Sequence, residues 1–294
     1  MDVIGQVRTN AAEITPPFTL IRPARLSTPL IFACPHSGRF YPEEMLAASA
    51  LDTAAIRRSE DAFVDGLIAG GVERGAPLLS ACYARAYIDV NREPYELDQA
   101  MFEDELPPFA CARTARVVAG LGSIARVVAE GQEIYRGKLT FGDAKRRIDQ
   151  VHRPYHAALK ALLDETRAAF GVAILIDWHS MPSAAAGSGR APAPDFVLGD
   201  RFGAACSRLV TGAWERELTA LGYRVARNAP YAGGFTTEFY GKPEKGVHAL
   251  QIEINRGLYL DEARVEPGAG FETVERDLRR VFTQLAPADW SRLT

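Results

Sequence analysis

The chain has 294 residues, of which 47% are hydrophobic and 24% are charged, and its formal net charge is -3. These values are ordinary for a globular protein, and no block of lysines and arginines indicates a surface that binds nucleic acid or anionic membranes. No apolar run reaches transmembrane length, and the N-terminus lacks the regions of a secretory signal. We therefore expect a cytoplasmic protein with a small-molecule partner, and its oligomeric state is left open.

The cysteines show no C-x-x-C spacing and are expected to be free thiols, the usual state in a reducing compartment. They are Cys34, Cys82, Cys111 and Cys206. Cys34 stands two residues before His36. We expect it to be a buried strand residue rather than a metal ligand, because cysteine is among the residues most often buried.

Apolar runs of strand length alternate with segments of helical period, which predicts an α/β fold. In chain order we expect a strand at 29–34, a helix at 52–70, strands at 76–80 and 83–90, a helix at 143–170, strands at 172–176 and 195–198, a helix at 202–221, a strand at 247–252 and a helix at 272–285. Pro154 should kink or divide its helix. A loose arm is expected over residues 1–25, and loops over 91–112, 181–194 and 228–237. Without a repeat or linker, the sequence predicts one domain over residues 1–294, with a mixed, mostly parallel sheet flanked by helices.

Reactive polar residues follow four of the apolar runs, at the point where each run ends. The clusters are Pro35-His36-Ser37-Gly38, Asn91-Arg92, Asp177-Trp178-His179-Ser180 and Glu253-Ile254-Asn255-Arg256. In open parallel sheets, ligands bind outside the carboxyl ends of the strands. The sequence therefore predicts that these clusters gather around one active-site cleft.

Two of the histidines at predicted strand ends can act as a pair of metal ligands. A catalytic zinc site needs two or three His, Asp or Glu ligands and an open position for water. His36 and His179 are the natural imidazole pair. On the predicted helix after the first strand, Glu60 or Asp61 can supply a carboxylate. Spacing alone leaves the alternative that each histidine is a hydrogen-bonding core residue.

A second pair of histidines, His152 and His156, has the i, i+4 spacing of zinc-binding helices. The run between them, Arg-Pro-Tyr, lacks the glutamate of the H-E-x-x-H motif. We therefore expect a packed or hydrogen-bonding pair at this position rather than a metal site.

Glu253 is a carboxylate in the middle of a predicted strand, on the face that Leu250 and Ile252 do not occupy. A charge at such a position is costly unless it meets a cation, a metal-bound water or a hydrogen-bond donor. Glu253 is therefore either a general base or the partner of Arg92 or Arg256 in an internal salt bridge.

Two arginines, Arg92 and Arg256, close Asn-Arg dipeptides at predicted strand ends. Guanidinium groups bind carboxylates bidentately, so these arginines indicate an acidic substrate or an oxyanion to stabilise. The alternative is a structural role in tying down a loop. The Gly233-Gly234 turn can also present backbone N–H groups to an anion, although such a turn is a weak signal alone.

Several longer motifs carry a resemblance to a known family. They are Pro-His-Ser-Gly at 35–38, Ser-Glu-Asp-Ala-Phe-Val-Asp at 59–65, Tyr-Ile-Asp-Val-Asn-Arg at 87–92, Gly-Leu-Gly-Ser-Ile at 120–124, Pro-Tyr-His at 154–156, Asp-Trp-His-Ser at 177–180, Asn-x-Pro-Tyr-x-Gly-Gly at 228–234 and Gln-Ile-Glu-Ile-Asn-Arg at 251–256. Taken in order from about residue 30 to 260, the set resembles the N-formylglutamate amidohydrolase family.

The resemblance implies a zinc-carboxypeptidase-like (phosphorylase/hydrolase-like) α/β fold and hydrolysis of an N-formyl amino acid to formate and the free amino acid. The implied substrate is N-formyl-L-glutamate, as in histidine degradation. One zinc ion per chain is implied, with His36, Asp61 and His179 as its ligands and Glu253 as the catalytic carboxylate. Glu60 is adjacent and is kept as the alternative to Asp61.

On this interpretation the partner is an N-acylated acidic amino acid. Arg92 and Arg256 would hold its carboxylates or the developing oxyanion, with Arg256 the first candidate for a side-chain carboxylate. The other expected substrate contacts are Asn91, Gly233, Gly234 and Thr236. Two alternatives remain: a related zinc acylase or carboxypeptidase-like hydrolase with another acyl group, and a non-catalytic ligand-binding protein of the same fold.

Overall fold

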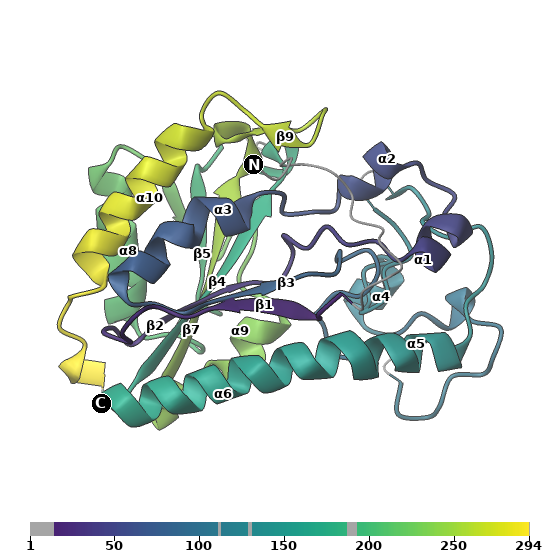
Figure 1. Ribbon diagram of the computed structural model, residues 1–294, viewed down its shortest axis with the longest axis horizontal. Coiled ribbons are helices and arrows are strands. Elements are labelled where there is room, and N and C mark those ends of the chain that lie inside the picture. The colour runs from purple at the N-terminus through teal and green to yellow at the C-terminus, as the bar shows by residue number, and fades with distance from the viewer. Residues whose placement is uncertain (1–14, 111–112, 129–130, 187–192, 294) are drawn as a thin grey trace. The chain divides into compact units, whose positions relative to one another are not determined.

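The computed structural model describes residues 15–110, 113–128, 131–186 and 193–293 (Figure 1). The chain divides into two compact units. Unit 1 comprises Met1–Thr19, Pro35–Glu60 and Ala81–Ala158, and unit 2 comprises Leu20–Cys34, Asp61–Ser80 and Leu159–Thr294. Cys111, most of the predicted arm and part of the predicted loop 181–194 lie outside the described residues.

A seven-stranded sheet forms the centre of unit 2. Its strands are β1 (Phe18–Ile21), β2 (Leu30–Cys34), β3 (Leu78–Ala81), β4 (Ala173–Met181), β5 (Phe196–Gly199), β6 (Val225–Arg227) and β7 (Val247–Asn255), in the order β1-β3-β2-β4-β7-β5-β6. β2 runs parallel to β3 and β4, β4 runs parallel to β7, and β5 is antiparallel to β7. The predicted α/β fold with a mixed, mostly parallel sheet is confirmed.

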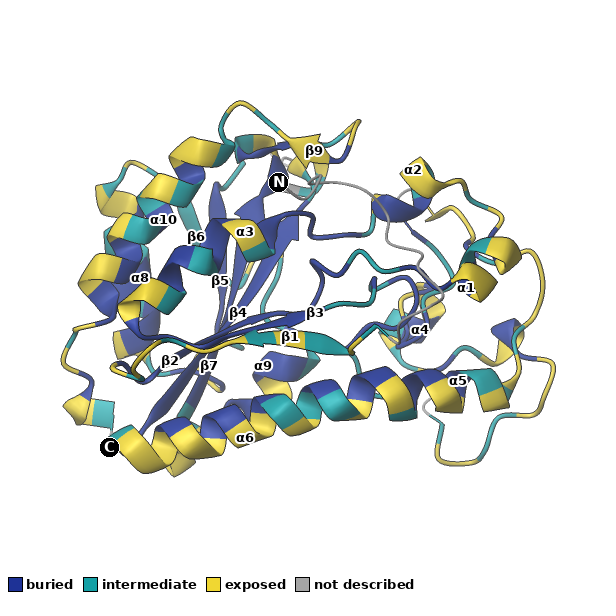
Figure 2. Ribbon diagram, viewed as in Figure 1, coloured by how far each residue is buried: buried dark blue, intermediate teal, exposed yellow. Residues whose placement is uncertain are grey.

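One face of this sheet is covered by helices that bury large aromatic side chains. The helices are α3 (Val64–Ile68), α8 (Arg208–Ala220) and α10 (Phe271–Leu285). Figure 2 shows α8 and α10 buried along one side and exposed along the other, as the apolar repeats of their sequences require. Phe32 of β2, Trp178 of β4 and Phe282 of α10 meet edge-on or tilted in this core. Every second side chain of these strands therefore points into this core.

The opposite face of β4 and β7 is where polar side chains are found. Side chains alternate along a strand, so the neighbours of the buried Trp178 and Ile252 point away from the aromatic core. Helix α9 (Phe235–Tyr240) packs against β7, and the N–H of Gly234 at its start donates to Gln251. The sheet thus separates an apolar core from a polar surface that is itself buried.

Unit 1 consists of short helices around a smaller apolar cluster. The helices are α1 (Glu43–Ala48), α2 (Thr53–Arg57), α4 (Ala115–Val118), α5 (Phe141–Arg147) and the first part of α6 (Arg153–Phe170), and the cluster contains Leu97, Met101, Phe102, Ile124 and Ala144. A single π turn, Ile148–His152, joins α5 to α6. The predicted division of this helix near Pro154 is confirmed.

The remaining small elements lie mostly in unit 2. They are helix α7 (Ser183–Ala186), the hairpin of β8 (Leu260–Asp261) and β9 (Glu266–Pro267), and the 3-10 helices Ala69–Arg74, Gln99–Met101, Pro243–Lys245, Arg256–Leu258 and Ser291–Leu293. Among the described residues, no helix is both long and apolar enough to cross a membrane.

The predicted helix over 52–70 is wrong, because the chain leaves helical geometry between α2 and α3. Phe63 adopts a left-handed conformation with φ 63° just before α3. The turn before Phe63 directs Asp61 toward β4, where the hydroxyl of Ser180 donates to the carboxylate of Asp61. A continuous helix could not satisfy this buried carboxylate, so Glu60 and Asp61 lie in a turn instead.

The predicted strand over 83–90 is also wrong. Only Tyr83 forms a β-bridge, with Phe40, and the following residues form turns. Asp89 accepts a hydrogen bond from the N–H of Asn91, its own neighbour in the chain, which replaces a strand ladder. Asn91 and Arg92 therefore follow a turn rather than a strand.

Other boundaries differ where capping and register decide them. Helix α8 begins at Arg208 rather than near 202, because Ser207 caps it through the N–H of Leu209 and because Arg201 and Phe202 have positive φ. Strand β1 lies in the expected arm, helix α9 begins in the expected loop at 228–237, and strand β6 was not predicted. β4 and β7 extend beyond the predicted runs, into their polar ends.

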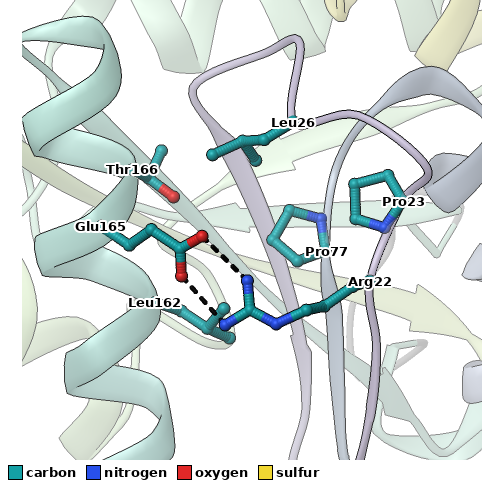
Figure 3. Close-up of a pocket in the computed structure, with 7 residues that line it drawn as sticks. All are labelled: Arg22, Pro23, Leu26, Pro77, Leu162, Glu165 and Thr166. Carbon is teal, nitrogen blue, oxygen red and sulfur yellow. Dashed lines mark hydrogen bonds and ion pairs between the residues drawn. The ribbon is translucent and has the colours of Figure 1, made fainter.

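A small pocket of about 170 Å³ lies where the segment after β1 meets α6. Figure 3 shows Arg22 facing Glu165 across it, with both guanidinium Nη atoms 2.9 Å from the carboxylate oxygens. Pro23, Pro77 and Leu162 supply apolar walls. The residues around the pocket include no histidine or cysteine, so we interpret this contact as a tie between two elements.

Candidate functional site

Two adjacent strands of unit 2 place four polar side chains in two rows on one face. In the parallel register, Asp177 lies opposite Gln251 and His179 lies opposite Glu253. Along each strand, the earlier residue contacts the later one. Asp177 Oδ2 is 3.1 Å from His179 Nε2, and Gln251 Nε2 donates to Glu253 Oε1 at 2.8 Å. The imidazole and the carboxylate are therefore each held by a neighbour on their own strand.

Asp61 reaches the same histidine from the turn before α3. Its Oδ2 is 3.0 Å from His179 Nδ1, while its Oδ1 accepts from Arg256 Nη2 at 3.0 Å. Ser180 donates to the same oxygen at 3.2 Å and accepts from Arg256 Nε at 3.1 Å. A buried carboxylate needs such compensation, so Arg256 makes a charged Asp61 tolerable in this position.

The surroundings of His179 favour positive charge. Burial lowers the pKa of this imidazole, but Asp177 first and then Asp61 raise it by more, so the pKa lies well above its usual value. Asp177 is itself fully buried, and within the described residues its carboxylate has no hydrogen-bond partner besides this ion pair. Two carboxylates thus converge on one ring, which is an electrostatic environment suited to a cation.

Glu60, the neighbour of Asp61, is engaged within unit 1. Tyr41 Oη donates to its Oε1 at 2.8 Å, and Arg57 contacts both carboxylate oxygens at 3.1 and 3.2 Å. Burial raises the pKa of Glu60, and the hydrogen bonds from Arg57 and Tyr41 oppose that rise. These contacts account for the buried carboxylate without a metal ion.

Asp89 is the centre of a polar cluster in unit 1. Its Oδ1 accepts from His36 Nε2 at 2.7 Å and from the N–H of Asn91 at 2.8 Å. Its Oδ2 accepts from Arg85 Nη2 at 2.7 Å and lies 3.9 Å from Arg92 Nη2. Burial raises the pKa of Asp89, but the charges of His36, Arg85 and Arg92 lower it to well below its usual value. Sequence reasoning gave no role to Asp89 or Arg85, although an acid inside an apolar run was a signal.

Arg92 is held by the main chain rather than by a close carboxylate. Its Nε donates to the carbonyl of Leu121 at 2.9 Å, and its Nη1 donates to the carbonyl of Asn91 at 2.8 Å. Burial lowers the pKa of this arginine, and the charge of Asp89 opposes the shift. The carbonyl contacts orient the guanidinium, and its nearest carboxylate, Asp89, is shared with Arg85 and His36.

The pair His152 and His156 makes hydrogen bonds to the main chain, as we expected. His152 Nε2 lies 2.9 Å from the carbonyl oxygen of Arg92, and His156 Nε2 lies 2.7 Å from that of Val90. A carbonyl oxygen only accepts, so both ring nitrogens carry the proton. The prediction of a hydrogen-bonding pair is confirmed.

The turn expected to bind an anion is partly engaged by Gln251. The N–H of Gly234 donates to Gln251 Oε1 at 2.7 Å, and Gly233 has φ 115°. Thr236 is fully buried, and Asn91 of unit 1 is buried as well. Gln251 thus connects this turn to Glu253. Sequence reasoning missed it, although a polar residue two positions before Glu253 on the same face was a signal.

Among the described residues, the buried group of His36, Asp61 and His179 could hold a metal ion. His36 is the second residue after β2, a strand that runs parallel to β4 with Ala33 opposite Asp177. Along the chain, His36 thus follows the strand that pairs with the one carrying His179. The chemistry of this group, two imidazoles and a carboxylate, is typical of catalytic zinc.

Known proteins resemble the chain over most of its length. The family model of N-formylglutamate amidohydrolase matches residues 28–260, a range with residues in both compact units. An N-formylglutamate deformylase from Pseudomonas putida is 30% identical over 263 residues, 88% of this chain and 91% of that protein. One from Pseudomonas aeruginosa is 30% identical over 238 residues, 80% of this chain and 83% of that protein.

Solved structures give the same result. The crystal structure of N-formylglutamate amidohydrolase from Ralstonia eutropha JMP134 is 37% identical, covers 92% of this chain and 98% of that one, and superposes with a TM-score of 0.88. A protein from Agrobacterium tumefaciens, at 15% identity and a TM-score of 0.65 over 92% of this chain and 95% of that one, shares the fold. On the extent of the family match and the identity to these relatives, the chain belongs to the N-formylglutamate amidohydrolase family.

Proposed function

We propose that this chain is a zinc-dependent amidohydrolase that cleaves N-formyl-L-glutamate to formate and L-glutamate. The names of the relatives from Pseudomonas putida and Ralstonia eutropha supply the substrate. The observation that carries the proposal is Glu253 directly opposite His179 on the next strand, with His179 itself in contact with Asp61. A potential base thus lies beside a potential ligand pair.

The donor set fits zinc. His36, Asp61 and His179 provide two imidazoles and a carboxylate, which leaves a position open for water. Each imidazole meets a second carboxylate through Nε2, Asp89 for His36 and Asp177 for His179. With Nε2 engaged in this way, Nδ1 would be the ligand nitrogen of each ring, and outer carboxylates commonly orient metal-bound histidines through such a contact. Zinc bound here would polarise the formyl carbonyl and make water a nucleophile near neutral pH.

Glu253 is proposed as the general base. Its carboxylate would take the proton of the attacking water and pass it to the nitrogen of the departing amino acid. Gln251 donates to one carboxylate oxygen and accepts from Gly234, so the base is fixed to both its strand and the adjacent turn. Such fixation orients the carboxylate for proton transfer.

The substrate carboxylates are proposed to bind Arg92 before Arg256. The guanidinium of Arg256 is bound to Asp61 and Ser180. That of Arg92 donates to main-chain carbonyls and lies 3.9 Å from Asp89, a carboxylate that it shares with His36 and Arg85, so more of its charge is left for an anion. Asn91, which is buried, precedes Arg92 in the same turn. Arg256 would then act by holding the metal ligand Asp61. Its contact with the substrate, which we expected from the sequence, becomes the second hypothesis after Arg92.

Two alternatives lead to different activities. A related zinc acylase or carboxypeptidase-like hydrolase would use the same residues on another acyl group. A ligand-binding protein of the same fold would need no base, and the hydrogen bond that holds Glu253 in place argues against it. The substrate that is cleaved distinguishes the proposal from the first alternative, and the presence of turnover distinguishes it from the second.

The test is a formate-release assay on purified, zinc-loaded protein with N-formylglutamate, N-acetylglutamate and a glutamyl dipeptide. We expect formate from the first substrate, about one zinc per chain, and a decrease in kcat of roughly two to four orders of magnitude in Glu253→Gln with zinc retained. Glu238→Gln, in an exposed ion pair with Arg201, is the control and should behave as wild type. Turnover of another substrate alone, or unchanged kcat in Glu253→Gln, would overturn the proposal.

A further inference from the structure

The turn that carries Arg92 has main-chain carbonyls that no neighbouring strand satisfies. Buried carbonyl groups in folded proteins require donors, and in a sheet the next strand supplies them. Val90 and Arg92 are not in a strand, and the donors to their carbonyl oxygens are the imidazoles of His156 and His152. Side chains of a helix thus replace a strand ladder at this turn.

The register of the helix that carries these imidazoles depends on a π turn. Pro154 has no N–H, and its ring collides with the carbonyl four residues earlier in a regular α-helix. The wide turn Ile148–His152 precedes α6 and accommodates the proline. His152 ends this turn and His156 follows one turn later, with ring centroids 4.4 Å apart and planes at 35°. Pro154 and the two histidines therefore act as one local device that presents two N–H donors side by side.

We propose that His152 and His156 are positioning residues that fix the main chain on both sides of Asn91 and thereby aim the guanidinium of Arg92 at the substrate carboxylate. The proposal rests on the proposed function, in which Arg92 binds that carboxylate. The residue between the two anchored carbonyls is Asn91, whose own carbonyl accepts from Arg92 Nη1. A displacement of this turn is therefore transmitted directly to the guanidinium.

The protonation of the two rings suits this task. Burial lowers the pKa of His156 to about 3, with the neighbouring His152 adding to the effect. Burial also lowers the pKa of His152 below its usual value, although the hydrogen bond that it donates to the carbonyl of Arg92 and the charge of Asp89 oppose this shift. Neutral rings keep their Nε2 protons for the two carbonyls and add no charge beside Arg92.

The test compares removal of the donor with its replacement. His156→Phe keeps the size of the ring but loses the N–H, whereas His156→Gln places an amide N–H near the original Nε2. In His156→Phe we expect the KM for N-formylglutamate to rise about tenfold, with kcat changed by less than about threefold and zinc content unchanged. His156→Gln should restore KM to within about threefold of wild type. The same pair of substitutions at His152 should give the same pattern.

His248→Phe is the matched control, since His248 is a buried histidine of unit 2 that accepts from the N–H of Ser207. It should lose stability without a change in KM. An unchanged KM in His156→Phe, or equal effects of Phe and Gln, would overturn the proposal.

A spectroscopic measurement tests the contact without any dependence on activity. Imidazole ¹⁵N NMR of the wild-type protein, assigned with the Gln variants, should show His156 as a neutral ring with its proton on Nε2 at about pH 5. A charged ring, or a proton on Nδ1, would overturn the proposal even if every variant misfolds. Absence of formate release by the wild type would refute the proposed function instead, and the NMR result would still decide whether the histidines hold the turn.

Discussion

The two Asn-Arg dipeptides of this chain have the same sequence but are held in different ways. Arg256 follows β7 and binds the carboxylate of Asp61 and the hydroxyl of Ser180. Arg92 follows a turn and binds the carbonyls of Leu121 and Asn91, and its nearest carboxylate, Asp89, lies 3.9 Å away and is shared with His36 and Arg85. A carboxylate partner neutralises a guanidinium, whereas carbonyl partners orient it and leave its charge for a ligand. On the proposed function, this difference favours Arg256 as a support of the metal site and Arg92 as the residue that binds the substrate.

The largest expected effect concerns the carboxylate that Arg256 holds. Asp61→Ala should reduce zinc from about one per chain to almost none, because one of three ligands is lost. Glu60→Ala should retain zinc, since Glu60 is engaged by Arg57 and Tyr41. Elemental analysis of the two variants checks this. Loss of zinc in Glu60→Ala alone would make Glu60 the ligand and would remove the role given to Arg256.

The second prediction compares the stabilities of two arginine variants. Arg256→Met leaves the buried Asp61 without its cation and should lower the free energy of unfolding by about 3–5 kcal/mol. Arg92→Met should lower it by about 1–2 kcal/mol, because hydrogen bonds to carbonyls and a longer contact with Asp89 are lost while Arg85 and His36 still pair with that carboxylate. Urea denaturation measures both, with Arg280→Met, an exposed arginine of α10, as the control. A larger loss in Arg92→Met would reverse the comparison.

The third prediction concerns the substrate. An unpaired buried guanidinium is costly, so N-formylglutamate should exceed the neutral N-formylglutamine in kcat/KM by at least roughly tenfold. Arg92→Met should erase most of that difference with zinc retained, and Arg92→Lys should restore only part because lysine lacks the planar fork. Kinetics with the two substrates decide the outcome. If Arg256→Met alone erases the difference while zinc is retained, Arg256 binds the side-chain carboxylate, as expected from the sequence, and the assignment to Arg92 is wrong.

The last prediction is a pH dependence from the turn that carries Arg92. The pKa of His156 is about 3 in the folded chain, below the value of about 6.5 expected after unfolding. The unfolded chain therefore binds more protons between these values, and stability falls as the pH falls from about 6.5 toward 3, by at most about 1.4 kcal/mol per unit. His156→Gln cannot titrate and should show a shallower slope in urea denaturation. His152 and Asp89 titrate in both proteins, so parallel slopes would contradict the shift.

Local patterns were sufficient to predict the elements that carry half of the candidate site. The apolar runs before His179 and around Glu253 predicted β4 and β7, and alternation predicted that Glu253 points away from the core. Both results depend on neighbours within a few positions along the chain. The zinc ligands and the catalytic role of Glu253 stay predictions.

Contacts between residues far apart in sequence decided the rest. Asp61 leaves the predicted helix because its partners, Ser180 and Arg256, come from β4 and the end of β7. The segment before Arg92 has the apolar composition of a strand. The carbonyls of Arg92 and Val90, however, accept from His152 and His156, which lie 60 and 66 residues later in the chain. No periodicity within the segment could reveal those donors.

The sequence by itself determined the α/β class, the two long strands, the family and the residue types that can bind zinc and move a proton. Only the tertiary structure decided which arginine is neutralised, which acid beside Asp61 is already paired, and that Asp89, Asp177 and Gln251 hold the reactive side chains. The physical reason is that strand and helix patterns follow from burial along a short segment. The charge, orientation and protonation of a buried polar group follow from whichever distant partners the fold brings to it.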